Sequence, residues 1–334
     1  MKHILAVSAL LLTPALALPT SAQETAEAVT PASVVTDASA EEWVAIAPED
    51  LLVMDLAPGA HDNPRTVIIQ LLPPPFSQPW VENIRALARA HWWDGTSVYR
   101  VVDNWVAQWG DVTEEKALPG NVASPAASYV VRDPGFIDRM QQRFRRSKVE
   151  DAAARLQRLF DRDNPTFQDV RDNPPGNPDQ YAAMTGFEKG WPLATDGTNT
   201  FPVHCYSHVG VARDIETTGT GSELYAVIGH APRQLDRNIA VVGRVIEGIE
   251  HLSTLPRGSG GAGVYENRAE DTPILSVRLA SEVADPPAFE YLDTDSESFA
   301  RYAAVRANRD DPFYSVPAGG VDICNVGVPI RRAE

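Results

Sequence analysis

Short apolar runs separated by turn residues dominate the hydrophobic pattern of the chain. Runs rich in apolar and β-branched residues occupy positions 51–56, 66–72, 96–102 and 272–279. Turn signals such as Pro58-Gly59 and Asp94-Gly95 lie beside them, as is typical of strands in an antiparallel sheet. The pattern therefore predicts a mainly β fold.

A smaller part of the chain has helical periodicity. Ser77 is a candidate N-cap with Pro79 in the following turn, and an apolar stripe follows at Val81, Ile84, Leu87 and Ala88. Similar spacing predicts one or two helices over 136–160 and another over 299–306. Many Arg and Gln residues lie between the apolar positions of 136–160, so that surface is either solvated or contacts a protein partner.

The first residues have the pattern of a targeting segment. Lys2 precedes an apolar run over 4–18, and Thr20-Ser21-Ala22 forms a small-residue cleavage site. The run is short for a bilayer span, so we expect a signal peptide at 1–22 and no stable membrane insertion after cleavage. The mature protein is then exported, to the periplasm or the medium. Residues 23–47 are expected to form a flexible leader.

Composition and charge narrow the range of partners. The chain has 334 residues, of which 43% are apolar and 22% charged, as in ordinary globular proteins. Its formal net charge is −16. This charge argues against nucleic acid and anionic membrane surfaces as partners.

The most informative stretch is WWDGTSVYRVVDNWVAQWGD at residues 92–111. It reads as two strand segments, broken at Asp103-Asn104, in which Arg100 and Gln108 are long polar side chains among apolar ones. Such side chains need partners, because burying them unpaired is unfavourable.

This stretch resembles the segment YDGTxFHRVIPGFMIQGGD of cyclophilin-type peptidyl-prolyl isomerases. The positions in register are Asp94, Gly95, Thr96, Arg100, Gln108, Gly110 and Asp111. Later segments are also similar to family patterns: 209–212 to LSMA, 219–225 to NTNGSQFFI and 234–245 to WLDGKHVVFGRV. The resemblance covers about 48–111 and 201–282.

The resemblance implies a closed eight-stranded antiparallel β-barrel capped by two helices. The cyclophilin-like domain then spans 48–282 and is interrupted by a partly helical insertion at 112–200. A C-terminal extension follows at 283–334.

The resemblance also implies a function, the cis–trans isomerisation of X-Pro bonds in proline-containing polypeptides, for which no metal or cofactor is needed. By this resemblance Arg100 stabilises the twisted amide and Gln108 holds the substrate backbone and orients the arginine. The expected substrate-binding residues are Trp105, Val106, Ala212, Tyr225 and Leu235 in the proline pocket, Gln234 and Ile239 at its rim, and Glu223 beside the substrate backbone.

Departures from the family pattern leave other functions open. The family has Phe at Trp105, Gln at Glu223, Trp at Gln234 and His at Ile239. Glu223 either adds a negative charge near the substrate backbone or pairs with Arg100. The alternatives to an isomerase are a weak or inactive peptide-binding module and a scaffold whose insertion and tail carry the function.

Cysteine, histidine and glycine residues suggest three further features. Cys205 and Cys324 either form one disulfide that ties the tail to the barrel or remain two free thiols. His204 and His208 are expected on one strand face, where structural roles are favoured over a metal site. The glycine-rich segment 258–263 lacks the ending of a phosphate-binding loop and is expected to be a flexible loop.

Overall fold

The computed structural model describes residues 29–132, 135, 137–139, 179–309, 313, 314, 316, 318 and 320–333. The predicted signal peptide and nearly all of the helical stretch at 136–160 lie outside these residues. Within the described part of the chain, no helix is long and apolar enough to cross a membrane.

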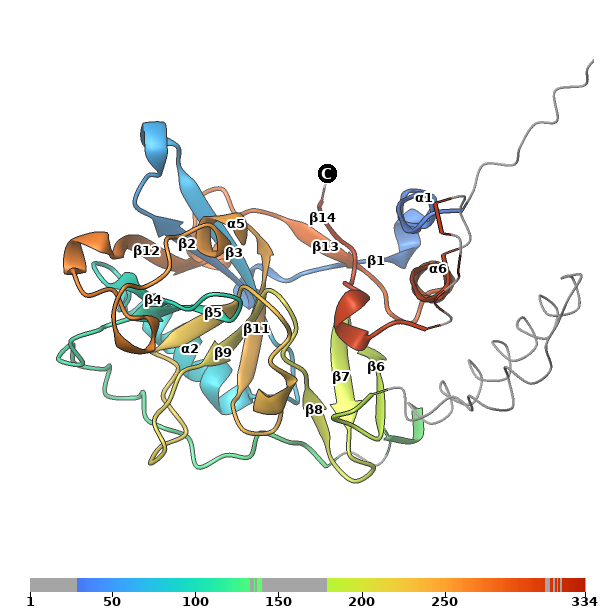
Figure 1. Cartoon of the computed structure of the whole chain (residues 1–334), viewed down its shortest axis with the longest axis horizontal. Coiled ribbons are helices and arrows are strands. Elements are labelled where there is room, and N and C mark those ends of the chain that lie inside the picture. The colour runs from blue at the N-terminus through green and yellow to red at the C-terminus, as the bar shows by residue number, and fades with distance from the viewer. Residues whose placement is uncertain are drawn as a thin grey trace, which may run out of the picture.

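A closed barrel of eight antiparallel strands forms the centre of the molecule (Figure 1). Around the barrel the strands are β10 (Leu224–Val227), β5 (Val106–Gly110), β4 (Ser97–Val101), β12 (Thr272–Leu279), β2 (Leu51–Leu56), β3 (Arg65–Leu71), β11 (Val241–Glu247) and β9 (His208–Val211). The predicted fold class is confirmed, and β2 and β12 have the predicted bounds.

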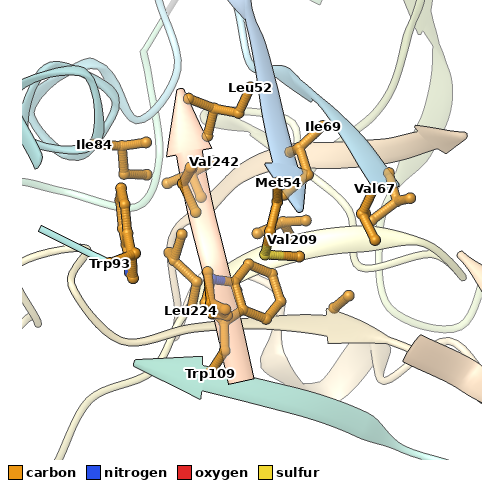
Figure 2. Packing of buried hydrophobic residues seen from close by; sticks show 14 of the residues in the cluster. Leu52, Met54, Val67, Ile69, Ile84, Trp93, Trp109, Val209, Leu224 and Val242 are labelled. Atoms are coloured by element: carbon orange, nitrogen blue, oxygen red, sulfur yellow. The ribbon is translucent and has the colours of Figure 1, made fainter. Parts of the chain in front are cut away.

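Alternate residues of the strands fill the barrel. Successive side chains of a strand point to opposite faces, so Leu52, Met54 and Leu56 of β2 all enter the interior. Figure 2 shows Leu52 and Met54 beside Ile69 of the neighbouring strand, with the large indole of Trp109 below them. A substrate must therefore bind to the outside of the barrel, because side chains occupy its interior.

Two helices of unequal length pack on the barrel. Helix α2 (Gln78–Arg89) buries the predicted apolar stripe, including Val81 and Ile84, in the barrel core. Ser77 occupies the N-cap position, but its φ is 53° and its side chain makes no capping hydrogen bond. Helix α5 (Glu250–Ser253) is a single turn.

The segment expected to be a flexible leader is instead ordered from residue 29. Helix α1 (Pro31–Thr36) and strand β1 (Trp43–Ala45) belong to a small layer beside the barrel. In this layer β1, β13 and β14 form a sheet, and α1 packs near α6 (Figure 1). The other members are β13 (Phe289–Leu292), β14 (Ile330–Arg332) and α6 (Glu297–Ala307). For residues 29–47 the expectation was wrong, because Val34 and Trp43 are buried against the C-terminal Phe299, a partner distant in sequence; residues 23–28 lie outside the described part of the chain.

A second three-stranded sheet occupies the end of the region expected as the insertion. Its strands are β6 (Met184–Glu188), β7 (Trp191–Thr195) and β8 (Thr200–Pro202). All five positions of β7 are buried, so the strand lacks the alternation that identifies a half-exposed strand.

A buried arginine joins this second sheet to the barrel. Arg244 of β11 donates from Nε and Nη2 to Gln70 Oε1 at 2.9 and 2.7 Å, and from Nη1 to the Gly190 carbonyl at 2.8 Å. Its guanidinium lies 4.4 Å from the ring centroid of Trp191. Burial lowers the pKa of Arg244 to about 9. These directional bonds fix β7 against the outer face of the barrel.

The two cysteines are paired. Cys205, just before β9, forms a disulfide with Cys324 of the C-terminal segment, and their Cα atoms are 5.1 Å apart. The bond attaches the tail to the barrel, as in the first of the two alternatives.

We expect the disulfide to stabilise the fold. The linked residues are 119 positions apart, and closing so long a loop restricts the unfolded chain, so the double variant Cys205→Ala/Cys324→Ala should lose about 2–4 kcal/mol of unfolding free energy. Urea denaturation measures this loss. Dithiothreitol should lower the midpoint of the wild type and leave that of the double variant unchanged; equal midpoints for the two oxidised proteins would contradict the prediction.

Candidate active site

A β-bulge sets the direction of the key side chains. Val98 pairs with Trp109 and Arg100 pairs with Gln108, so Tyr99 is an extra residue in β4. Val98 lies in the barrel core, while Tyr99 and Arg100 both contact the Gln108 side chain. The bulge therefore places two successive side chains, Tyr99 and Arg100, on the outer face.

Arg100 is held at two points. Its Nη1 donates to Gln108 Oε1 at 2.8 Å, and its Nε donates to the Ala262 carbonyl at 2.7 Å. The guanidinium carbon lies 5.2 Å from the ring centroid of Trp105. Partial burial lowers the pKa of Arg100 from its usual value, but a guanidinium remains protonated. No described residue accepts a hydrogen bond from Nη2, which leaves that donor for a ligand.

The glycine-rich segment contributes one of these contacts. Ala262 lies within it, and the Gly258 amide donates to the Val101 carbonyl at 2.9 Å. The expected flexible loop is thus attached to β4 beside Arg100.

Six of the predicted substrate-binding residues form one apolar cluster next to Arg100. Tyr225 lies between Gln108 and Gly210 in the strand register. A Cβ on Gly210 would come within 2.3 Å of the Tyr225 hydroxyl, so the glycine makes room for this ring. The six residues are Trp105, Val106, Ala212, Tyr225, Leu235 and Ile239. The cluster has the apolar surface that a proline ring needs; binding itself stays a prediction.

The other two predicted residues lie outside this cluster. Gln234 is exposed, and its carbonyl accepts a hydrogen bond from Asn238 Nδ2 at 3.2 Å. Glu223 accepts from the Tyr99 hydroxyl at 2.8 Å and from the Asp111 amide at 2.7 Å. Among the described contacts, Glu223 does not pair with Arg100 directly.

A hydrogen-bonded chain nevertheless connects Glu223 to Arg100. The Tyr99 hydroxyl donates to Glu223 and accepts from Gln108 Nε2 at 2.5 Å, while Gln108 Oε1 accepts from Arg100. The role of Tyr99 was missed in the sequence, since a regular strand would direct it away from Arg100. Its position next to the arginine, where the family has His, was the available signal.

Burial governs the ionisation of this chain. It raises the pKa of Glu223 to about 7, with repulsion from Asp111 and Glu114 adding to the rise, although hydrogen bonds from Tyr99 and the Asp111 amide oppose it. Burial and the nearby Glu223 carboxylate also raise the pKa of Tyr99 above its usual value. Tyr99 therefore stays neutral and connects a titrating carboxyl to Gln108.

A cavity of about 520 Å³ adjoins this chain. Tyr99, Gln108 and Glu223 are among the residues that line it, and Ala212 is shared with the apolar cluster. A peptide whose proline contacts the cluster could thus place a neighbouring residue in the cavity.

The histidines occupy separate positions. Residues 206 and 207 form a turn in which Ser207 has a φ of 69°, and β9 begins at His208. The expectation that His204 and His208 share one strand face is therefore wrong. His204 contacts Tyr225 and Asp236, whereas His208 Nδ1 lies 2.6 Å from the Val203 carbonyl. The described residues contain no group of three or more His, Cys, Asp or Glu placed to hold a metal ion.

Comparison with known proteins finds a similar fold. Similar solved structures include the cyclophilin AquaCyp293 from Hirschia baltica, which is 20% identical over 91% of this chain and 97% of that chain, with a TM-score of 0.58. A cyclophilin-type peptidyl-prolyl cis-trans isomerase from Cryptosporidium parvum is 10% identical over 69% of this chain and 96% of that chain, with a TM-score of 0.35.

No curated protein matches the chain significantly. Residues 77–279, however, match the model of the family described as cyclophilin type peptidyl-prolyl cis-trans isomerase/CLD. This match spans more than half of the chain, and the protein therefore belongs to the cyclophilin-type peptidyl-prolyl cis-trans isomerase family.

Proposed function

We propose that the protein accelerates the cis–trans isomerisation of X-Pro bonds in exported polypeptides and so assists their folding. One observation carries the proposal: Arg100 is fixed by Gln108 beside an apolar cluster, with Nη2 directed to no described acceptor. The membership of the family supports the reaction in general, and the site supports it for this chain.

The reaction needs electrostatic stabilisation of one strained species. Rotation about a peptide bond has a barrier of about 18–20 kcal/mol, because resonance makes the bond partly double. In the twisted state the proline nitrogen becomes pyramidal and regains its lone pair, which a guanidinium donor can stabilise. The apolar cluster holds the proline ring, so the amide lies beside Arg100.

Preorganisation makes this donor effective. The bonds to Gln108 Oε1 and the Ala262 carbonyl, together with the Trp105 ring, restrict the arginine side chain. A donor that is already oriented needs little reorganisation when the amide twists, and such fixed groups are a major source of catalysis.

Arg100→Ala tests the role of the arginine in this reaction. We expect kcat/KM in a protease-coupled assay with Ala-Pro peptides to fall about 100-fold, since removing one oriented donor from a transition state commonly has an effect of this size. Arg89→Ala is the matched control: Arg89 is an exposed arginine of α2 that pairs with Glu282, and its loss should leave kcat/KM unchanged.

The same assay separates the enzyme from a peptide-binding module. Glu223, Gln234 and Ile239 differ from the family pattern, and this difference favours the peptide-binding module as the second candidate. A folded wild type that binds proline peptides in calorimetry but accelerates none of them would establish the module. Equal activity of the wild type and Arg100→Ala would remove Arg100 from the mechanism.

We also expect a pH dependence set by Glu223, whose pKa is about 7. Above this pH the carboxylate accepts from Tyr99, and Tyr99 then accepts from Gln108, which leaves Gln108 Oε1 for Arg100. Protonation at lower pH weakens this arrangement. We expect kcat/KM to fall about three- to tenfold from pH 8 to pH 6, the effect of roughly one hydrogen bond.

Glu223→Gln provides the control for this prediction. It preserves the size of the side chain but removes the titrating group, so its rate profile should be flat across the same pH range. A wild-type profile that is already flat, or a variant that keeps the wild-type slope, would show that another group is responsible.

We also propose that the protein is exported, to the periplasm or the medium. The signal-like pattern ending at Ala22 supports this, and so does the disulfide between Cys205 and Cys324, because such bonds persist mainly in oxidising compartments. Cell fractionation followed by N-terminal sequencing should find a mature chain beginning at Gln23. Full-length protein retained in the cytoplasm would contradict export.

A further inference from the structure

A chain of buried polar side chains extends from the apolar cluster toward the second sheet. The Tyr225 hydroxyl lies 2.9 Å from His204 Nε2, and His204 Nδ1 lies 2.9 Å from Asp236 Oδ1. Arg233 Nε donates to Asp236 Oδ2 at 2.5 Å, and its Nη1 donates to Asp179 Oδ2 at 2.7 Å. The chain thus begins in the cluster and ends at Asp179, in the region expected as the insertion.

The donors and acceptors along this chain are mutually consistent. The Asp236 carboxylate can only accept, so it takes the Nδ1 proton of His204 as well as the His204 backbone amide, 2.8 Å away. His204 Nε2 then contacts the Tyr225 hydroxyl, which can either donate or accept a hydrogen bond. The bonds from Asp179 to His204 therefore have a defined direction, and the hydroxyl adapts to the last one.

Burial makes these positions interdependent. All five residues have exposed fractions of 0–5%. Such low exposure is rare for charged side chains unless they are paired. Removing one partner of a buried ion pair leaves the other charge unpaired, which is strongly unfavourable. Arg233 therefore cannot change position without losing Asp179, Asp236 or both.

The same chain also supports a wall of the apolar cluster. Leu235 lies between Arg233 and Asp236 at the end of the short 3₁₀ helix Arg233–Leu235, and the amide of Ile239 donates to the Leu235 carbonyl at 3.2 Å. Fixing Arg233 and Asp236 therefore fixes Leu235, while His204 fixes Tyr225.

We propose that Asp179 is a positioning residue for the proline pocket, acting through Arg233, Asp236 and His204 on Tyr225 and Leu235. The inference rests on the proposed function, because it assigns a residue to the same site. It gives the region at 112–200 a role in substrate affinity through Asp179.

The first test is Asp179→Asn, which preserves shape and removes the charge. We expect KM for an Ala-Pro peptide to rise about three- to tenfold, with kcat within about twofold of the wild type. A pocket that binds the proline ring equally in the ground state and in the transition state affects KM alone. Tyr225→Phe removes only the hydroxyl at the other end and should have an effect of the same kind.

A double-mutant cycle distinguishes transmission from general weakening. If the chain carries the effect, Asp179→Asn combined with Tyr225→Phe should raise KM no more than the larger single change. Asp196→Asn is the matched control. This carboxylate lies in the same region at 112–200 and is 3.8 Å from Arg237, which follows the short helix of Arg233, but it is not part of the hydrogen-bonded network. Its KM should equal that of the wild type.

Three results would overturn the proposal. They are an unchanged KM in folded Asp179→Asn or Tyr225→Phe, additive increases of KM in the double variant, or an equal increase of KM in Asp196→Asn.

Calorimetric binding of the same peptide distinguishes a failure of the positioning role from a failure of the proposed function. A wild type that binds without catalysis refutes the isomerase, while a three- to tenfold higher Kd in Asp179→Asn would still support the positioning role.

Discussion

The extra residue in β4 is the constraint on which the site depends. With Tyr99 inserted between the pairs Val98–Trp109 and Arg100–Gln108, Val98 remains in the core while Arg100 reaches the outer face. In the same sequence without the bulge, regular alternation would leave Tyr99 outside but turn Arg100 and the residues after it to the opposite face. It would then bring a guanidinium into an interior already filled by residues such as Trp109. The barrel can therefore keep a packed core and present its donor outside only because one residue is left unpaired.

Two buried arginines connect the outer layers to this barrel. Arg244 connects β11 to the second sheet, and Arg233 connects the loop before β11 to Asp179. Apolar surfaces tolerate sliding, but a buried cation is stable only where its specific acceptors are in place. The second sheet therefore has a defined position relative to the barrel, and so has Asp179.

Local pattern predicted the elements with the clearest apolar signal. The apolar run at 51–56 predicted β2 and the helical stripe from Val81 to Ala88 predicted α2, while register with family motifs placed Arg100 and Gln108 on neighbouring strands. Strand β7 was missed because it is buried at every position. Strand β1 was missed because its partner, β13, lies more than half the chain away. The contact from Tyr99 to Glu223 depends on the bulge, and the pairing of the cysteines depends on three-dimensional geometry, so neither could be derived from spacing.

The small sheet of β1, β13 and β14 has a consequence for the order in which the chain can fold as it emerges with its N-terminus first. The last strand of the barrel, β12, precedes β13, so the barrel can close while β1 still has no partner. Strand β1 then waits as an open edge, to which other chains could pair, until β13 has been made. The brevity of this strand, three residues, limits that hazard. The layer of β1, β13 and β14 thus needs the C-terminal segment, whereas the strands of the barrel do not.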